Sequence, residues 1–300
     1  MTIAKAPPVP TAKGYGAIVF AVVIWAGWIV ATRDQVASTS VLDISLLRYL
    51  PPVVLLAPVW MRRGFIPRGE DWRLVAIMAT GWGGIFVMLT AKGLETVPAS
   101  LFGPLVPAML PLTVGLWDRA VEGVRLRPQR KAGLALILIS IALTIGPALA
   151  AGDRGFLSGV PYLLCAALGW SAFTIAFRRS TLSGVEAVAY ISLWTMPFLL
   201  IAVLVVGTDI PQMSPGRIGW MVLSQGVLSG VVAATCFAYA VRHLGAARTS
   251  SFTSLVPMGA AVGGWLALGE SVGPLGWAAV VFACLGVAMV NGAFAGLLRR

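Results

Sequence analysis

Ten apolar windows along the chain are each long enough to cross a lipid bilayer as a helix. A helix rises about 1.5 Å per residue, so roughly 20 apolar residues cover about 30 Å of hydrocarbon. We therefore predict an all-α integral membrane protein with ten transmembrane helices, and nine is the main alternative. The windows are residues 14–32, 42–61, 74–91, 98–117, 132–150, 156–177, 184–206, 218–241, 247–268 and 272–296.

The distribution of charge supports a membrane protein and indicates its orientation. Only 11% of the residues are charged, against about 25% in soluble proteins. The net charge of +11 would suit nucleic acid, but the charges lie in short clusters between the apolar windows. With the N-terminus in the cytoplasm, the inner segments hold 17 of the 22 Lys and Arg residues and the outer loops hold four. The positive-inside rule therefore predicts two cytoplasmic termini, with the bilayer rather than nucleic acid as a partner.

Two segments half a chain apart repeat the same pattern. Residues 94–107 align without a gap with residues 244–257, sharing the first Leu, one Ser and the closing Leu-Val-Pro. An Arg also follows a Trp by eight residues in both halves, after Trp25 and after Trp170. This pattern divides the chain into a disordered cytoplasmic tail (1–13) and two five-helix repeats (14–150 and 151–300).

The number of helices in each repeat fixes how the repeats are related. Five is odd, so the second repeat enters the membrane from the opposite side to the first. The repeats are then inverted relative to each other, and inverted repeats in a membrane protein indicate a transporter with its site between them. We expect a monomer, with a homodimer left open.

Prolines and hydroxyl residues recur near the middle of the fourth and ninth windows. Pro107 and Pro257 each remove a backbone N–H and free carbonyl groups, which membranes tolerate where they line a cavity. The alternative is a packing kink. Ser100, Ser250 and Ser251 precede these prolines, and their hydroxyls can bind a ligand or bond to a carbonyl one turn earlier. We take all five as candidate substrate-binding residues.

Aromatic residues and one amide are further candidates for a substrate site. Trp82 lies in the helix-breaking segment Gly-Trp-Gly-Gly, with Phe86 one turn later, and Trp25 and Trp170 lie deep in their windows. A buried indole needs a partner for its N–H group, although aromatic residues at helical spacing also pack without binding a ligand. Gln225 lies within the eighth window, and an amide in hydrocarbon needs a hydrogen-bond partner.

Charged residues are rare inside the windows. Arg48 is the one basic residue clearly within a span, about six residues from the outer face and near Asp43. We expect it to anchor the helix by reaching the surface, and binding of a substrate carboxylate is the alternative. Acidic residues lie only at span boundaries, which favours a facilitator or weakly coupled exporter over a proton-coupled cation pump.

Catalytic and metal-binding patterns are not found. Cys165, Cys236 and Cys284 are isolated within apolar windows, without CxxC or His neighbours. HExxH, GxSxG and paired intramembrane carboxylates do not occur either. We therefore expect no enzyme activity, no metal and no cofactor.

Several motifs follow one another in a familiar order: Trp25-Ala-Gly-Trp28, Leu47-Arg48-Tyr49, Ala99-Ser100 through Pro107, Tyr239 through Pro257, and Gly269-Glu270. Over the whole chain this order resembles the EamA-type ten-helix exporters of the drug/metabolite transporter superfamily, including their aromatic amino-acid exporters. The first repeat departs from the pattern, because Trp117-Asp118-Arg119 and Glu122 replace a Gly-Glu pair. The resemblance implies a bacterial inner-membrane carrier whose cavity is lined mainly by the third, fourth, eighth and ninth spans, and it adds Tyr239 to the candidate residues.

The features together predict export of a small-molecule substrate by alternating access. The expected substrates are small apolar or aromatic metabolites, above all amino acids. A multidrug-cation exporter is the alternative within transport, and the missing central carboxylate weakens it. A lipid scramblase or flippase is a further alternative, because it also needs only a polar groove between helices.

Overall fold

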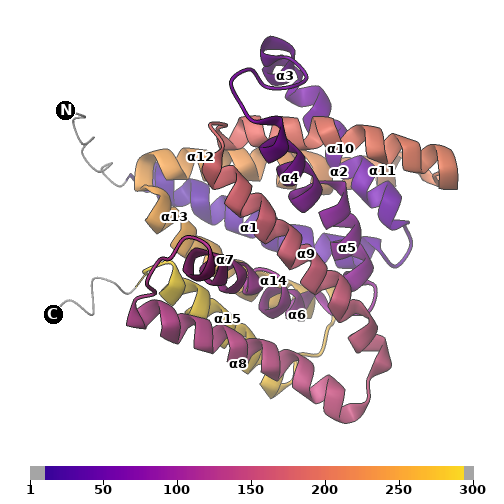
Figure 1. Ribbon diagram of the computed structural model, residues 1–300. Helices are drawn as coiled ribbons and strands as arrows, with labels where there is room; N and C mark the ends of the chain where they lie inside the picture. The colour runs from indigo at the N-terminus through magenta and orange to yellow at the C-terminus, as the bar shows by residue number, and fades with distance from the viewer. Residues whose placement is uncertain (1–10, 294–300) are drawn as a thin grey trace, which may run out of the picture.

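The computed structural model is a helical bundle in which most long helices run between the same two ends (Figure 1). It describes residues 11–293, apart from the side chains of Ala246 and Ala247, and this part of the chain contains no strand. The helices are α1 (Ala12–Gln35), α2 (Val41–Leu55), α3 (Ala57–Arg63), α4 (Trp72–Trp82), α5 (Gly84–Leu94), α6 (Ala99–Leu105), α7 (Met109–Ala120), α8 (Pro128–Ala151), α9 (Arg154–Arg179), α10 (Gly184–Val206), η1 (Ile210–Gln212), α11 (Pro215–Met221), η2 (Val222–Val232), α12 (Ala233–Leu244), α13 (Ala246–Phe252), η3 (Thr253–Leu255), α14 (Val256–Leu268) and α15 (Pro274–Val290).

The membrane prediction is confirmed, while the count of ten spans stays a prediction. Among the described residues, eight helical segments are long and apolar enough to cross a bilayer, or nine if the bent pair α2 and α3 is one span. The last apolar helix, α15, has 17 residues and is shorter than these. Most of the predicted tail, residues 1–10, lies outside the described residues, and residues 12 and 13 belong to α1.

The second predicted span is not a straight helix. The chain bends by 63° between α2 and α3, near Leu56. Pro51 and Pro52 lie inside α2, and Pro58 lies in the first turn of α3. These prolines remove backbone N–H donors around the bend, so the helix cannot continue straight.

Four other spans contain an irregular segment near their middle. Gly83 separates α4 from α5, and Pro107 lies in the turn that separates α6 from α7. The corresponding spans of the second half contain the π-helix η2 and the junction of η3 with α14, where Pro257 lies in the first turn. Irregular backbone in a membrane protein needs partners inside the protein, so these segments mark its interior.

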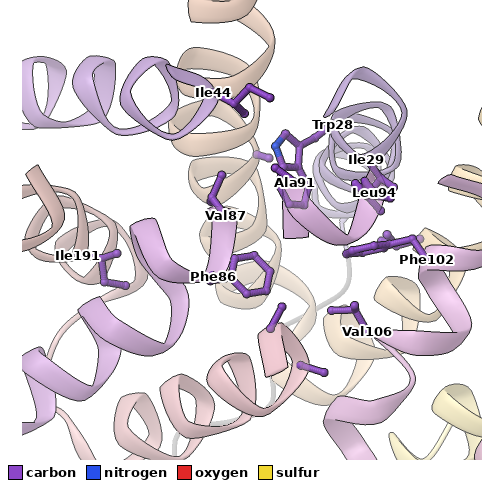
Figure 2. Packing of buried hydrophobic residues seen from close by; sticks show 14 of the residues in the cluster. Trp28, Ile29, Ile44, Phe86, Val87, Ala91, Leu94, Phe102, Val106 and Ile191 are labelled. Carbon is purple, nitrogen blue, oxygen red and sulfur yellow. The ribbon is translucent and has the colours of Figure 1, made fainter. Parts of the chain in front are cut away.

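The two halves of the chain are interleaved. Helix α1 packs on η2 and α12 of the second half, and α9 packs on α4 and α5 of the first half. The pairs α2 with α10, α6 with α14, and α8 with α15 also join the two halves. Small residues allow this close approach: Gly81 faces the backbone of Gly169, and Gly133 faces that of Gly286. Figure 2 shows the resulting core, where Trp28, Phe86 and Phe102 turn toward the same interior space.

Candidate functional site

A buried amide lies where α1 meets η2. Gln225 is fully buried, and its Oε1 accepts a hydrogen bond from Trp28 Nε1 at 2.6 Å. Its Nε2 donates to Thr32 Oγ1 at 2.9 Å and to Gln35 Oε1 at 2.7 Å. The Gln35 amide in turn donates to Ser224 Oγ at 3.1 Å. We call these five residues the polar corner.

The spacing of residues along α1 explains the polar corner. Trp28, Thr32 and Gln35 are four and three residues apart, so they lie on one face of the helix and point at the same part of η2. A buried amide without partners would be costly in an apolar surrounding. The network therefore fixes α1 against η2, and the expectation that Gln225 finds partners inside the protein is confirmed.

A group of stacked rings lies where α9 meets α4 and α5. The ring centroid of Trp82 lies 4.7 Å from that of Phe173 and 6.2 Å from that of Trp170. Phe86 lies 6.1 Å from Trp170, and Phe177 extends the stack from Phe173 at 5.7 Å. We call these five residues the aromatic corner. Trp82, Phe86 and Trp170 were candidate residues, and the structure brings them together.

A glycine break positions the ring and the carbonyl group of Trp82. Helix α4 ends at Trp82 because Gly83 has φ −92° and ψ −147°, outside the helical region. A Cβ atom on Gly83 would overlap with the carbonyl oxygen of Ala79 and with Thr195 Oγ1. The freed carbonyl of Trp82 accepts a hydrogen bond from the Tyr49 hydroxyl at 2.8 Å. The break thus links the aromatic corner to α2.

A small cavity lies between the two halves, beside the aromatic corner. Its volume is about 20 Å³, which is room for one water molecule. Both halves contribute to it, through Arg48, Tyr49, Pro52, Trp82, Val188, Ile191, Ser192, Ser229, Gly230 and Ala234. The cavity therefore joins a basic side chain, three residues with hydroxyl groups and one of the stacked indoles.

The position of Arg48 differs from the expectation that it reaches the membrane surface. Arg48 is only 6% exposed. Its Nη1 donates to the carbonyl oxygen of Gln225 at 3.3 Å and to Ser229 Oγ at 3.0 Å. The guanidinium carbon lies 4.4 Å from the ring centroid of Trp28, a cation–π contact. Arg48 points to the interior because η2 lies beside α2, which a hydropathy window cannot reveal.

The acid expected near Arg48 has other partners. The Asp43 carboxylate accepts hydrogen bonds from the Thr208 hydroxyl and from the backbone N–H of Asp209. It therefore holds the segment that follows α10 and does not pair with Arg48.

The broken spans α6–α7 and α13–α14 approach closely where Gly103 meets Pro257. A Cβ atom on Gly103 would overlap with Pro257, so only glycine allows this approach. Pro107 is buried in the turn after α6. Both prolines lie at irregular segments of their spans, and their role in binding substrate stays a prediction. Ser100 is buried in the first turn of α6, where its backbone N–H binds the Glu270 carboxylate at 2.9 Å.

The serines before Pro257 lie in a locally bonded turn. The carbonyl oxygen of Ser250 accepts from Thr253 Oγ1 at 2.7 Å, and that of Ser251 accepts from Ser254 Oγ at 2.6 Å. Hydroxyl bonding to a carbonyl one turn earlier is therefore common in this segment, as the sequence allows. Asn291 Nδ2 also donates to the Ser250 carbonyl at 2.8 Å, which ties the turn to the end of α15.

Of the candidate residues, only Arg48 and Trp82 line this cavity, and Trp25 and Tyr239 pack elsewhere. Trp25 packs against Phe237 of α12, with ring centroids 5.5 Å apart. Tyr239 is 38% exposed and stacks on His243 at 4.0 Å between centroids. The cavity and corners also contain residues that were not candidates from the sequence, among them Trp28, Thr32, Gln35, Tyr49, Phe173, Phe177, Ile191, Ser192, Ser224 and Ser229. The spacing along α1 is the signal that would have identified the first three.

An ion pair closes one end of the contact between the halves. Arg33 Nε lies 3.7 Å from Glu270 Oε1, and Arg33 also donates to the carbonyl oxygen of Leu94 at the end of α5. The Glu270 carboxylate accepts from the backbone N–H groups of Ala99 at 2.8 Å and Ser100 at 2.9 Å. An anion at a helix N-terminus is favourable, so Glu270 caps α6 of the other half. We call Arg33 and Glu270 the Arg33 cluster.

A larger charge cluster lies at the opposite end. Asp118 accepts from Arg130 Nη2 at 2.8 Å and from Arg178 Nη2 at 2.9 Å. Glu122 lies 3.8 Å from Arg178 Nη2 and 3.3 Å from Arg179 Nη2. These five residues, the Arg178 cluster, join α7 and the loop after it to α8 and α9. The acids that replace Gly-Glu in the first repeat therefore form ion pairs with the second.

The comparison with protein families gives two matches. The model of the EamA-like transporter family matches residues 12–146 and, separately, residues 157–292. Together the matches cover both halves of the chain.

Individual relatives cover almost the whole chain. A protein of Streptantibioticus cattleyicolor named "probable terminal-alkyne amino-acid exporter" is 27% identical over 286 residues, 93% of each chain. The uncharacterized inner membrane transporter YedA of Escherichia coli K12 is 24% identical over 289 residues, 92% of this chain and 90% of YedA. A crystal structure matches with a TM-score of 0.63 at 18% identity, covering 97% of this chain and 98% of that one. That last likeness shows the fold alone.

Proposed function

Since this chain belongs to the EamA-like transporter family, we propose that it exports small apolar or aromatic metabolites, above all amino acids. Transport proceeds by alternating access across the bacterial inner membrane. The observation that carries this proposal is the cavity between the two halves, where the indole of Trp82 faces hydroxyl groups and Arg48. A site with an apolar wall on one side and polar groups on the other suits a small amphipathic molecule.

The pattern of contacts between the halves supports alternating access. Each helix of one half has a counterpart in the other half. The contact of α1 with η2 corresponds to the contact of α9 with α4, and α2 packs on its own counterpart, α10. An inverted repeat of five helices produces this exchange. The protein can then adopt two related conformations in which the halves exchange roles, and each conformation opens the cavity to a different side of the membrane.

The two charge clusters fit the same exchange. Arg33 ends α1 and pairs with Glu270 beyond α14, whereas Arg178 ends α9 and pairs with Asp118 in α7. Each cluster thus links the first helix of one half to the fourth helix of the other half, at opposite ends of the molecule. We assign the Arg178 cluster to the cytoplasmic side, because the distribution of Lys and Arg predicts cytoplasmic termini.

Efflux from proteoliposomes tests the proposal. Vesicles containing the full-length protein are preloaded with labelled Phe, Trp, Met, Thr, Lys or a quaternary ammonium dye, without a proton gradient. We expect saturable loss of Phe, Trp or Met. Loss of the dye alone, and only with an imposed proton gradient, would replace this proposal by a multidrug-cation exporter. Lipid movement without loss of any water-soluble solute would instead indicate a scramblase.

A further inference from the structure

Within the described residues 11–293, Arg48 is a buried cation without a counter-ion. It is 6% exposed, and its Nε has no hydrogen-bond partner. Seven ion pairs join side chains of residues 11–293, and none of them includes Arg48. A charge within a membrane span is costly, and such residues face a cavity or a partner that compensates them. The contacts with two oxygens and one indole ring leave the net charge in place.

The other half of the molecule shows that the fold does not require this charge. Ser40 and Ser183 cap α2 and α10 in the same way, each accepting from the backbone N–H three residues later. Eight residues after these caps lie Arg48 and Ile191, and both line the cavity. A hydrophobic side chain therefore serves at the matching position, so packing alone does not explain the arginine.

The cavity has a recognisable chemical bias. None of the ten residues that line it is acidic, whereas Arg48 supplies a full positive charge and Ser192 and Ser229 supply hydroxyl groups. A guanidinium binds a carboxylate through paired hydrogen bonds. An ammonium group would find no opposite charge on these walls.

We propose that Arg48 is the binding residue for the carboxylate of the transported molecule. The apolar end of the transported molecule lies toward Trp82 and the rest of the aromatic corner. The ligand class is a small monocarboxylate with an apolar or aromatic tail, and an α-ammonium group is not required for binding. This proposal rests on the proposed function, since a cavity of about 20 Å³ must widen before such a molecule enters.

Thermal unfolding of the purified full-length protein tests the proposal independently of transport. The ligands are L-phenylalanine, 3-phenylpropionate, L-phenylalaninamide and 2-phenylethylamine, which share a ring and differ in charge. We expect the two carboxylates to raise Tm, and the amide and the amine to have no effect. Equal stabilisation by L-phenylalaninamide, or stabilisation by none of the four, would overturn the assignment.

Variants of Arg48 test whether this residue binds the carboxylate that raises Tm. Arg48→Gln keeps a donor toward Ser229 but removes the charge, and it should weaken carboxylate binding by about 10- to 100-fold. Arg48→Lys, which keeps the charge without the paired donors, should have an intermediate effect. Arg63→Gln is the matched control, because Arg63 pairs with Glu186 outside the cavity. Carboxylate binding that survives in Arg48→Gln would contradict the proposal, and if this variant does not fold, the ligand series on the unaltered protein decides.

Flux measurements separate this inference from the proposed function. Carboxylate-selective binding without efflux of labelled phenylalanine would leave the Arg48 site standing and remove the export function. If L-phenylalaninamide inhibits the efflux of labelled phenylalanine as strongly as 3-phenylpropionate does, the export function stands and the Arg48 site is removed.

Discussion

The polar corner and the aromatic corner occupy matching places but have opposite chemistry. In the first, α1 meets η2 through the amide of Gln225, and in the second, α9 meets α4 through the stacked rings of Trp82 and Phe173. Both contacts join the first helix of one half to the third span of the other. The fold therefore repeats its packing while the side chains differ, and this difference gives the cavity between the corners a polar side and an apolar side.

Breaking the polar corner should have the largest effect. Gln225→Leu leaves the indole N–H of Trp28 and the amide oxygen of Gln35 without their partner. Each unpaired buried group costs about 1–3 kcal/mol, so we expect a marked fall in Tm and loss of transport. Thermal melting of the detergent-purified variant measures this. Gln212→Leu, at an exposed position, is the control, and equal Tm values for the two variants would show that the network does not hold α1 to η2.

The second-largest effect on Tm should come from a change in the backbone of the aromatic corner, at Gly83. An Ala at position 83 places a Cβ atom against the carbonyl oxygen of Ala79, and such overpacking costs about 1–3 kcal/mol. Gly83→Ala should therefore lower Tm and displace Trp82. Near-UV circular dichroism reports the environment of the indoles. Gly27→Ala is the matched control because its Cβ would meet open space, and a normal spectrum and Tm for Gly83→Ala would contradict the role given to the break.

Removing one ring of the aromatic corner should have a smaller effect and alter substrate selectivity. Trp82→Leu removes one ring of the stack, and an aromatic pair contributes about 0.5–1.5 kcal/mol beyond its buried area. Binding of Phe and Trp should then weaken by roughly 3- to 10-fold, with Met changed less. Half-saturation in the efflux assay measures this, against Trp265→Leu, whose ring is 54% exposed. Equal losses for Phe and Met would argue that Trp82 only packs.

The smallest expected effects come from the charge clusters at the two ends. Glu270→Gln removes one side of the Arg33 cluster, and Asp118→Asn removes the centre of the Arg178 cluster. The side chains of both acids are largely buried, whereas their arginine partners are partly exposed to solvent. Such solvent-screened pairs contribute about 0–1 kcal/mol, so each variant should shift the balance between the two open states by no more than about fivefold. The shifts should be in opposite directions, measured as labelling of a cysteine in the cavity from each side. Shifts in the same direction would contradict the assignment of one cluster to each end.

Much of the fold followed from local sequence signals. Runs of apolar residues predict helices of the right length, and Pro107 and Pro257 predict the interruption of their spans because proline acts on its own backbone. Gln225 was identified for a similar reason, since an amide in hydrocarbon needs a partner wherever it lies.

The depth and direction of side chains could not be predicted in the same way. Arg48 was expected at the surface because apolar periodicity does not distinguish lipid from protein interior, and only the position of η2 reveals that it is buried. The exposure of Tyr239 could not be predicted for the same reason. The bend after α2 was missed because its three prolines lie within an otherwise continuous apolar window.

The most direct test of the account is the accessibility of Ser192, which lines the cavity from α10. Ser192→Cys is made in a chain whose free cysteines, Cys165, Cys236 and Cys284, are replaced by Ala. A membrane-impermeant thiol reagent is then added to one side of oriented proteoliposomes at a time. We expect labelling from either side and slower labelling from both when phenylalanine is present. Labelling from one side only, or labelling that phenylalanine does not change, would contradict a substrate cavity that opens alternately to the two sides.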